Sequence, residues 1–348
     1  MKQHFHPHAP LRIFGISGLV TAVSLAAVAV FMGAGALGAA LVLVAVELAF
    51  SFDNAVINAK VLARMSRFWQ QMFLTVGVVL AIFGMRVVFP MLIVMVTAHL
   101  PWSTVLDLAL HHPDEYAARL EAAHPAISAF GGSFLLMLAL HFFMDDEKRV
   151  HWIAHIERPL KAAARWWLPA VITVTLVALF AVAVPERWTQ IWQAGISGVL
   201  LFLAINLFTE WIGRTTRTLP GANHGGEDVS HTGWVALLLF GYLQILDASF
   251  SFDSVIGAFA ITNDVILIAV GLGVGAIWVR SLTVYMVRRR LLSAYTYLEH
   301  GAHYAVLTLA AAMFVALVVE VPQVITGLVG IGLILSSIVA SRQARLAK

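Results

Sequence analysis

Repeated apolar runs of about twenty residues limit the fold of this chain more than any other feature. An α-helix rises about 1.5 Å per residue, so a run of this length suffices to cross about 30 Å of hydrocarbon. Hydrophobic residues make up 60% of the 348 residues and charged residues only 12%, whereas soluble domains are about 25% charged. The composition therefore excludes a soluble enzyme, a nucleic-acid-binding protein and a disordered chain. It predicts an all-α polytopic membrane protein whose first partner is the lipid bilayer.

The apolar runs predict ten transmembrane helices, and the basic residues support this number. With ten spans both termini lie on one side, together with nearly all of the lysines and arginines of the loops; the other side receives only Arg119 and Arg187. Because basic loops resist translocation, we expect a multi-pass protein of the inner (plasma) membrane with both termini in the cytoplasm. The expected spans are residues 13–32, 36–62, 70–97, 126–144, 166–184, 190–211, 233–261, 264–287, 303–320 and 322–340.

Short motifs recur in the same order in the two halves of the chain, which predicts an internal repeat. Residues 15–18 and 195–198 both read G-I-S-G, and residues 50–53 and 250–253 both read F-S-F-D. Five spans per repeat is an odd number, so the two repeats insert in opposite orientations. Such inverted repeats are typical of transporters with a site at the repeat interface, although a duplicated scaffold without a transport path is an alternative. The expected repeats, which form one membrane domain, are residues 1–184 and 185–348.

Four carboxylates lie inside the expected spans, where insertion scales give a cost of at least about 2.5–3.5 kcal/mol for each charge. Each therefore needs a cation, an arginine or a proton as its partner. Two of the expected spans hold one arginine each, Arg86 and Arg280, which could act as charge partners. Pairing with both arginines would leave two negative charges uncompensated, so we prefer cation binding over purely structural ion pairs; protonation is the third interpretation. The carboxylates are Glu47, Asp53, Asp247 and Asp253.

Helical spacing places further oxygen-bearing side chains beside these carboxylates. Ser51, Asn54 and Asn58 share a helix face with Glu47. The second half repeats the pattern in part, because Ser251 and Ser254 follow Asp247 at the same spacing. The aspartates at 53 and 253 lie about 120° away on an ideal helix. Either the helix unwinds near Ser-Phe-Asp and they join this face, or they face an arginine instead. The candidate ligands are all hard oxygens, which favours Mn²⁺, Ca²⁺ or Mg²⁺.

The paired acidic motifs also resemble a known family. E-x-x-x-S-F-D-N at Glu47–Asn54, D-x-x-x-S-F-D-S at Asp247–Ser254 and G-M-R at Gly84–Arg86 are similar to motifs of the TerC family (tellurium-resistance protein C-like integral membrane proteins), in particular its larger, uncharacterised branch. The resemblance implies a cation or small-solute exporter, since several relatives are regarded as Mn²⁺ or Ca²⁺ exporters and some as aids to metal loading of exported proteins. It implies these metal-site positions: Glu47, Asp53, Asn54, Asp247 and Asp253.

We therefore expect a divalent cation transporter of the inner membrane, most simply a Mn²⁺ exporter, with the metal ion as its substrate and no prosthetic group. The chain contains no pairing of a nucleophile with a base and no zinc-protease motif, so we expect no catalytic residues and no enzymatic activity. One alternative is a membrane accessory without transport activity that serves metal or tellurite resistance or the metalation of exported proteins. A small-solute exporter is another.

The segment 145–165 begins with the acidic residues Asp145, Asp146 and Glu147 and continues with the pattern of an amphipathic helix. Trp152, Trp166 and Trp167 can anchor such a helix at a membrane surface. His151 and His155 lie four residues apart and could instead bind a regulatory metal. We prefer the membrane-surface helix.

Overall fold

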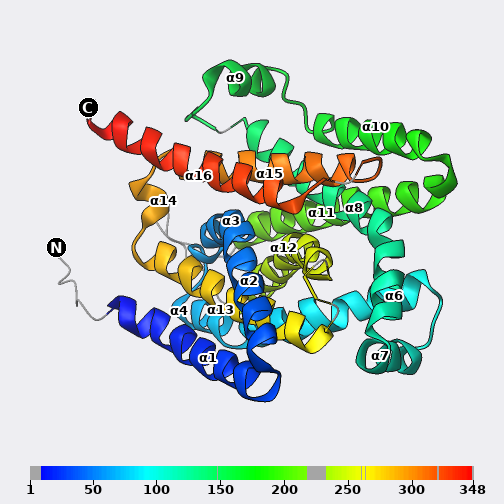
Figure 1. Ribbon diagram of the computed structural model, residues 1–348. Helices are drawn as coiled ribbons and strands as arrows, with labels where there is room; N and C mark the ends of the chain where they lie inside the picture. The colour runs from blue at the N-terminus through cyan, green and yellow to red at the C-terminus, as the bar shows by residue number, and fades with distance from the viewer. Residues whose placement is uncertain are drawn as a thin grey trace. The chain divides into compact units, whose positions relative to one another are not determined.

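The protein is built of helices joined by short loops, as the computed structural model in Figure 1 shows. The structure describes residues 9–146, 148–217, 233–259, 261–262, 264–319 and 321–346. Ser251 and Asp253 are described by their backbone alone. No β-strand occurs in the described ranges, so the predicted all-α class is confirmed.

The chain divides into two compact units, each made of segments that are distant in the sequence. Each unit combines parts of both predicted repeats, so the repeat boundary between residues 184 and 185 is not a boundary between the units, and it stays a prediction. Unit 1 comprises Met1–Ala63, Arg67–Ala123 and Leu243–Ala294, and unit 2 comprises Arg64–Ser66, His124–Tyr242 and Tyr295–Lys348.

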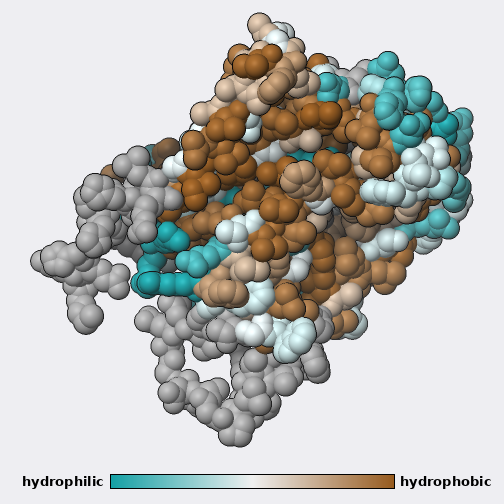
Figure 2. Space-filling view, turned by 90° about the horizontal axis from the view of Figure 1, so that it is seen from below, coloured by the Kyte–Doolittle hydropathy of each residue, from teal (hydrophilic) through white to brown (hydrophobic). Residues whose placement is uncertain are grey.

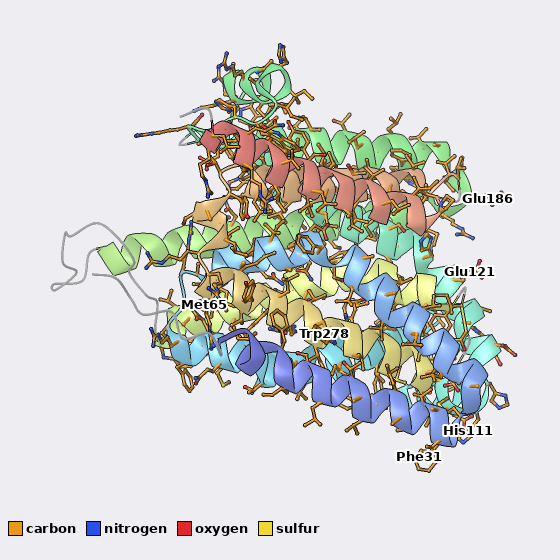
Figure 3. All side chains as sticks on the ribbon, turned by 60° about the vertical axis from the view of Figure 1, so that its left-hand side comes forward. Phe31, Met65, His111, Glu121, Glu186 and Trp278 are labelled. Atoms are coloured by element: carbon orange, nitrogen blue, oxygen red, sulfur yellow. The ribbon has the colours of Figure 1, made fainter. Side chains whose placement is uncertain are left out.

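Unit 1 is organised around α13 (Val265–Arg288), which packs against α1, α2, α3 and the π-helix η1. The side chain of Asp264 begins α13 by accepting hydrogen bonds from the backbone N–H groups of Ile266 and Leu267. Figure 3 labels Trp278 of α13, whose ring stacks on Phe14 of α1. The other elements of unit 1 are α1 (Ala9–Phe31), α2 (Gly33–Phe50), α3 (Phe52–Leu62), α4 (Arg67–Leu74), α5 (Val76–Val79), η1 (Leu80–Val88), α6 (Phe89–Thr97), α7 (Trp102–His111), the start of α8 (Pro113–Phe143), the end of α12 (Gly233–Phe259) and α14 (Leu291–Ala294).

In unit 2, two pairs of helices pack closely: α15 with α16, and α10 with α11. Gly195 and Gly198 of α11 let this helix pack closely against α10 and α8. A Cβ added at Gly195 would meet Val177 of α10, and one at Gly198 would meet Phe130 of α8. The elements of unit 2 are the remainder of α8, α9 (Ala154–Ala162), α10 (Leu168–Ala183), η2 (Pro185–Arg187), α11 (Trp188–Arg217), the start of α12, α15 (Leu298–Val315) and α16 (Gln323–Leu346).

The first Ser-Phe-Asp motif interrupts a helix, and the second does not. Helix α2 ends at Phe50, α3 begins at Phe52, and the two helices are bent by 51° around Ser51. In contrast, α12 continues through residues 251–253 to Phe259, so the unwinding that would bring Asp253 onto the helix face of Asp247 does not occur. Neither motif contains proline or glycine, so its local sequence permits an uninterrupted helix and the surrounding packing decides.

The length and composition of the helices identify a polytopic membrane protein. Among the described residues, six helices are long and apolar enough to cross a membrane, or seven if the bent pair α2 and α3 counts as one span. Leu168–Ala183 and Gly233–Ala248 are apolar but shorter. Large apolar side chains on α1, such as Phe31, are exposed, and hydrophobic side chains cover much of the face in Figure 2. The ten-span count remains a finer prediction.

Candidate functional site

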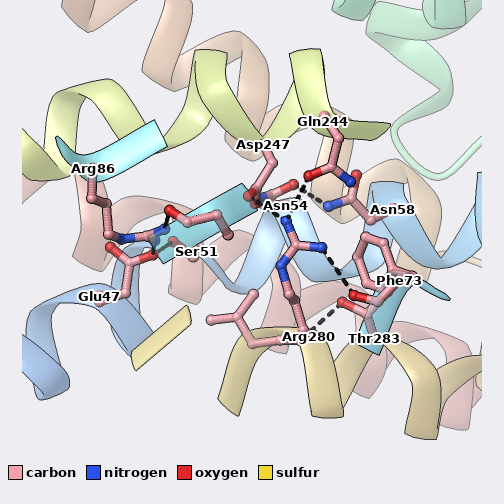
Figure 4. A network of polar contacts seen from close by, with 12 residues as sticks. Glu47, Ser51, Asn54, Asn58, Phe73, Arg86, Gln244, Asp247, Arg280 and Thr283 are labelled. Atoms are coloured by element: carbon pink, nitrogen blue, oxygen red, sulfur yellow. Dashed lines mark hydrogen bonds and ion pairs between the residues drawn. The ribbon is translucent and has the colours of Figure 1, made fainter. Parts of the chain in front are cut away.

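Unit 1 encloses a network of charged and polar side chains, which Figure 4 shows from close by. Its charged members lie on four elements, α2, η1, α12 and α13, and all of them are buried. They are Glu47, Arg86, Asp247 and Arg280. The network therefore combines two carboxylates and two guanidinium groups that were expected inside the membrane.

Glu47 and Arg86 form the first buried ion pair of this network. The hydroxyl of Ser51 donates to Glu47 Oε1 at 2.9 Å, and Arg86 Nη1 donates to the carbonyl of Ala81 at 2.8 Å. Arg86 lies in the π-helix η1, a geometry that is rare and frequent at functional sites. Space for Glu47 depends on Gly275, since a Cβ added there would lie 2.6 Å from the Glu47 side chain.

Asp247 and Arg280 form the second ion pair, with Arg280 Nη2 2.7 Å from Asp247 Oδ2. The guanidinium also donates to Gln244 Oε1 at 3.2 Å and to the carbonyl of Phe73 at 3.3 Å. Its central carbon lies 4.3 Å from the centre of the Phe73 ring, within cation–π range. Gly77 leaves room for this group, because a Cβ there would lie 2.7 Å from Arg280 Nη1. The guanidinium is thus held on several sides.

Asn54 connects the broken helix to the second ion pair. Its Nδ2 donates to Asp247 Oδ1 at 2.9 Å, while its Oδ1 accepts from Asn58 Nδ2 at 2.7 Å. The stripe predicted from helical spacing therefore contains two hydrogen-bonded groups: Ser51 with Glu47, and Asn54 with Asn58 and Asp247.

Asp53 differs from Glu47 and Asp247 because no arginine whose side chain is described pairs with it. It is only 6% exposed, and its Oδ1 accepts from the backbone N–H of Asn54 at 2.9 Å. Among the described residues it makes no ion pair. It lies in the first turn of α3, where the helix dipole favours a negative charge. Asp53 is thus a buried carboxylate that only helix geometry compensates in the described part of the chain.

The remaining predicted site residues are only partly described. The side chains of Asp253 and Ser251 lie outside the described residues, and Ser254 is buried. Within the residues described, no group of three or more histidine, aspartate or glutamate side chains is arranged to hold a metal ion. The arrangement instead offers the carboxylate of Asp53, which has no counter-charge in the described residues, together with several amide and hydroxyl oxygens. The other two carboxylates, Glu47 and Asp247, each form an ion pair with an arginine.

Some residues that shape the site have a weak or absent signal in the sequence. Gln244 is a polar residue in an apolar run, three residues before Asp247, so its place on the same helix face could have been found from spacing. Gly77, Gly275 and Phe73 are ordinary residues of apolar helices, and their importance depends on which helix packs beside them.

Comparison with known proteins places the chain in a family. Residues 52–346 match the family described as "Protein of unknown function (DUF475)". The matched range includes Asp53, Arg86, Asp247 and Arg280, and it begins five residues after Glu47. No curated protein and no solved structure matches the chain.

Proposed function

The chain belongs to the DUF475 family, and we propose that this member moves a divalent cation across a membrane, most simply Mn²⁺. The observation that carries the proposal is Asp53, a buried carboxylate beside a helix break without a positively charged partner among the described residues. A carboxylate inside a membrane is costly unless it is protonated or meets a cation. An interrupted helix also frees backbone carbonyls that can serve as ligands.

The proposed ligands are hard oxygens around the break. Asp53 supplies the negative charge, and backbone carbonyls freed where α2 ends at Phe50 supply neutral oxygens. The helix of the second motif would add Asp253. Carboxylate and amide oxygens suit Mn²⁺, Ca²⁺ and Mg²⁺.

The two ion pairs have a distinct role in this proposal. Arg86 and Arg280 neutralise Glu47 and Asp247, so these carboxylates would bind a cation only after their arginines move. The arginines would then act as tethered cations that compensate the site when it is unloaded. Binding of a divalent cation and displacement of an arginine would be linked, because both compete for one carboxylate.

Two further observations support the repeat and the choice of substrate in this proposal. Glu47 and Asp247 hold corresponding positions in the two motifs, and each pairs with the arginine of the following expected span. This equivalence supports the 5+5 inverted repeat with its ten spans, in which two related halves face opposite sides of an inner membrane. The motif resemblance to the TerC family supports Mn²⁺ as the substrate and export as the direction.

The first prediction tests Asp53. In proteoliposomes, Asp53→Asn should reduce Mn²⁺ flux to the background of protein-free vesicles, because the variant keeps the shape of the side chain but lacks the negative charge. The measurement is the rate of Mn²⁺ entry, read with a trapped fluorescent indicator, with Ca²⁺ and Mg²⁺ as parallel substrates.

A matched control is Asp107→Asn, which removes a carboxylate that is 60% exposed. It should transport like the wild type. Size-exclusion chromatography should first show that both variants are inserted. A wild-type rate of Mn²⁺ flux in Asp53→Asn would then contradict the proposal.

One observation favours a second candidate function, a membrane accessory without transport activity. No three acidic or histidine side chains converge in the described residues, and Glu47 and Asp247 already have arginine partners. An accessory of this kind would show no metal flux in wild-type proteoliposomes and would co-purify with stable partner proteins.

A further inference from the structure

The segment between α8 and α10 in unit 2 carries an exposed basic and apolar surface that the proposed cation site does not use. Its residues share high exposure and lie on α9 or in the stretches beside it. In Figure 3 the helix of this segment lies at the upper edge, and several of its side chains end in nitrogen atoms that point away from the ribbon. The α9 surface consists of Arg149, Val150, Ile156, Arg158, Arg165, Trp166 and Trp167.

The inner side of α9 is fixed by Glu157, which is completely buried. Its Oε1 accepts from the backbone N–H groups of Trp152 and Ile153 at 3.2 and 3.1 Å, and its Oε2 lies 2.9 Å from Lys148 Nζ. One turn further, Lys161 donates to the carbonyl of Lys148. These contacts determine which face of α9 points outward, so the exposed arginines are a consequence of how the helix is anchored.

The outward face carries arginines that contact no carboxylate of the described protein, and the exposed acidic residues of the segment, Asp145 and Asp146, lie at its start, before Arg149. The carboxylate of Glu157 is already engaged with Lys148. Arg149 and Arg158 make no ion pair or hydrogen bond with any residue whose side chain the structure describes. Arg165 Nη1 donates to the carbonyl of the adjacent Ala164 at 3.3 Å, which leaves its charge uncompensated. The surface is therefore complementary to an anionic partner.

The two tryptophans indicate the depth at which this partner lies. Trp166 is 91% exposed, and both tryptophans directly precede the apolar helix α10. Tryptophan is enriched at the boundary between hydrocarbon and headgroups, where its ring contacts lipid and its N–H contacts polar groups. Arginines beside such tryptophans lie at the level of lipid phosphates.

We propose that the α9 surface binds the headgroups of anionic phospholipids, with Arg149, Arg158 and Arg165 contacting phosphates and Trp166 and Trp167 inserted beside them. Arginine suits this role because its planar guanidinium can donate two parallel hydrogen bonds to a phosphate. The apolar side chains of Val150 and Ile156 extend the contact toward the acyl chains. This inference is independent of the proposed cation transport.

The experiment uses the full chain in neutral detergent and counts bound lipids by native mass spectrometry, with phosphatidylglycerol and phosphatidylcholine as probes. The wild type should retain phosphatidylglycerol in preference to phosphatidylcholine. The variant Arg149→Gln/Arg158→Gln/Arg165→Gln should lose at least tenfold of its affinity for phosphatidylglycerol, since each basic residue near an anionic surface contributes about fivefold. The same three positions changed to lysine should keep most of the preference.

A control removes an exposed arginine elsewhere, Arg119→Gln, and should bind both lipids like the wild type. If the triple glutamine variant does not fold, salt tests the wild type alone: raising the salt to about 0.5 M should weaken phosphatidylglycerol binding and leave phosphatidylcholine binding unchanged. Equal binding of both lipids by the wild type, an unchanged triple variant or an equally weakened control would overturn the proposal.

Discussion

Arg280 is one of the largest completely buried side chains of the protein. Desolvating a guanidinium costs several kcal/mol, and its contacts with Asp247, Gln244 and Phe73 compensate for that cost. A buried pair of this kind is sensitive to loss of one partner, because the other charge is then left in an apolar environment. The pair is therefore a test of whether the charges or the shapes of these side chains matter for folding.

We predict that Arg280→Gln lowers the free energy of unfolding by about 3–5 kcal/mol, since it leaves Asp247 without its counter-charge. The double variant Asp247→Asn/Arg280→Gln should lose less than the single variant, because no uncompensated charge remains. The measurement is denaturant unfolding in detergent as a double-mutant cycle. A double variant that is less stable than Arg280→Gln would contradict this account.

Glu157 is a buried carboxylate of unit 2, and the groups around it determine its pKa. Burial by itself raises the pKa of Glu157, but the hydrogen bond with Lys148, the N–H of Ile153 and nearby positive charges outweigh it, so the net pKa lies below the usual 4.5. A lowered carboxylate pKa in the folded state stabilises the protein above pH 4.5. This contribution is lost as the pH falls below 4.5 through the pKa of the folded state.

We predict that the thermal stability of the wild type falls when the pH decreases below about 4.5. Glu157→Gln should already be less stable at neutral pH, by about 3–5 kcal/mol, because Lys148 then lacks its counter-charge. It should lose less additional stability on acidification. Thermal unfolding of both proteins between pH 7 and pH 3.5 measures the difference, and parallel acid profiles would refute this role of Glu157.

At the scale of single helices, the two G-I-S-G motifs have different surroundings. A Cβ added at Gly198 of α11 would lie 2.3 Å from the carbonyl oxygen of Phe130 in α8. A Cβ added at Gly15 or Gly18 of α1 would meet no neighbouring group within 4 Å. Small residues at helix contacts let backbones approach closely in membrane proteins. Only the second motif uses its glycines in this way.

We predict that Gly198→Ala destabilises unit 2 by about 1–3 kcal/mol, because the added methyl group meets backbone that cannot move aside easily. Gly18→Ala is the matched control from the other motif, and it should be neutral or slightly stabilising, since alanine favours helix by up to about 1 kcal/mol. Thermal unfolding in detergent compares the two. Equal effects would show that the close approach at Gly198 does not matter.

The two Ser-Phe-Asp motifs likewise have similar sequences but different structural surroundings. Their sequences are nearly identical, yet one coincides with a bend at Ser51 and the other lies within α12. In the first motif, the hydroxyl of Ser51 bonds the carboxylate of Glu47, which is held by Arg86. A contact between residues that are distant in the sequence, such as Glu47 and Arg86, cannot be predicted from the sequence of the motif alone.

For the whole molecule, orientation in the membrane is a prediction that a chain without cysteine makes simple to test. Single cysteines at Arg67, His112 and Arg345 can report sidedness through a membrane-impermeant maleimide. Ten spans predict that His112→Cys is labelled from outside intact cells, and that Arg67→Cys and Arg345→Cys react only after permeabilisation. Labelling of Arg345→Cys from outside would mean an odd number of spans.

The amino-acid sequence was sufficient to establish the class of the protein and to point to the acidic residues of the candidate site. Lipid cannot solvate backbone groups or charges, so apolar runs must form helices, and buried acids such as Glu47 and Asp247 must find partners. Tertiary structure alone decided that these partners are Arg86 and Arg280, that Asp53 receives neither, and that the compact units combine distant segments. These outcomes depend on which helices become neighbours, and helical periodicity gives the face of a residue but not what packs against it.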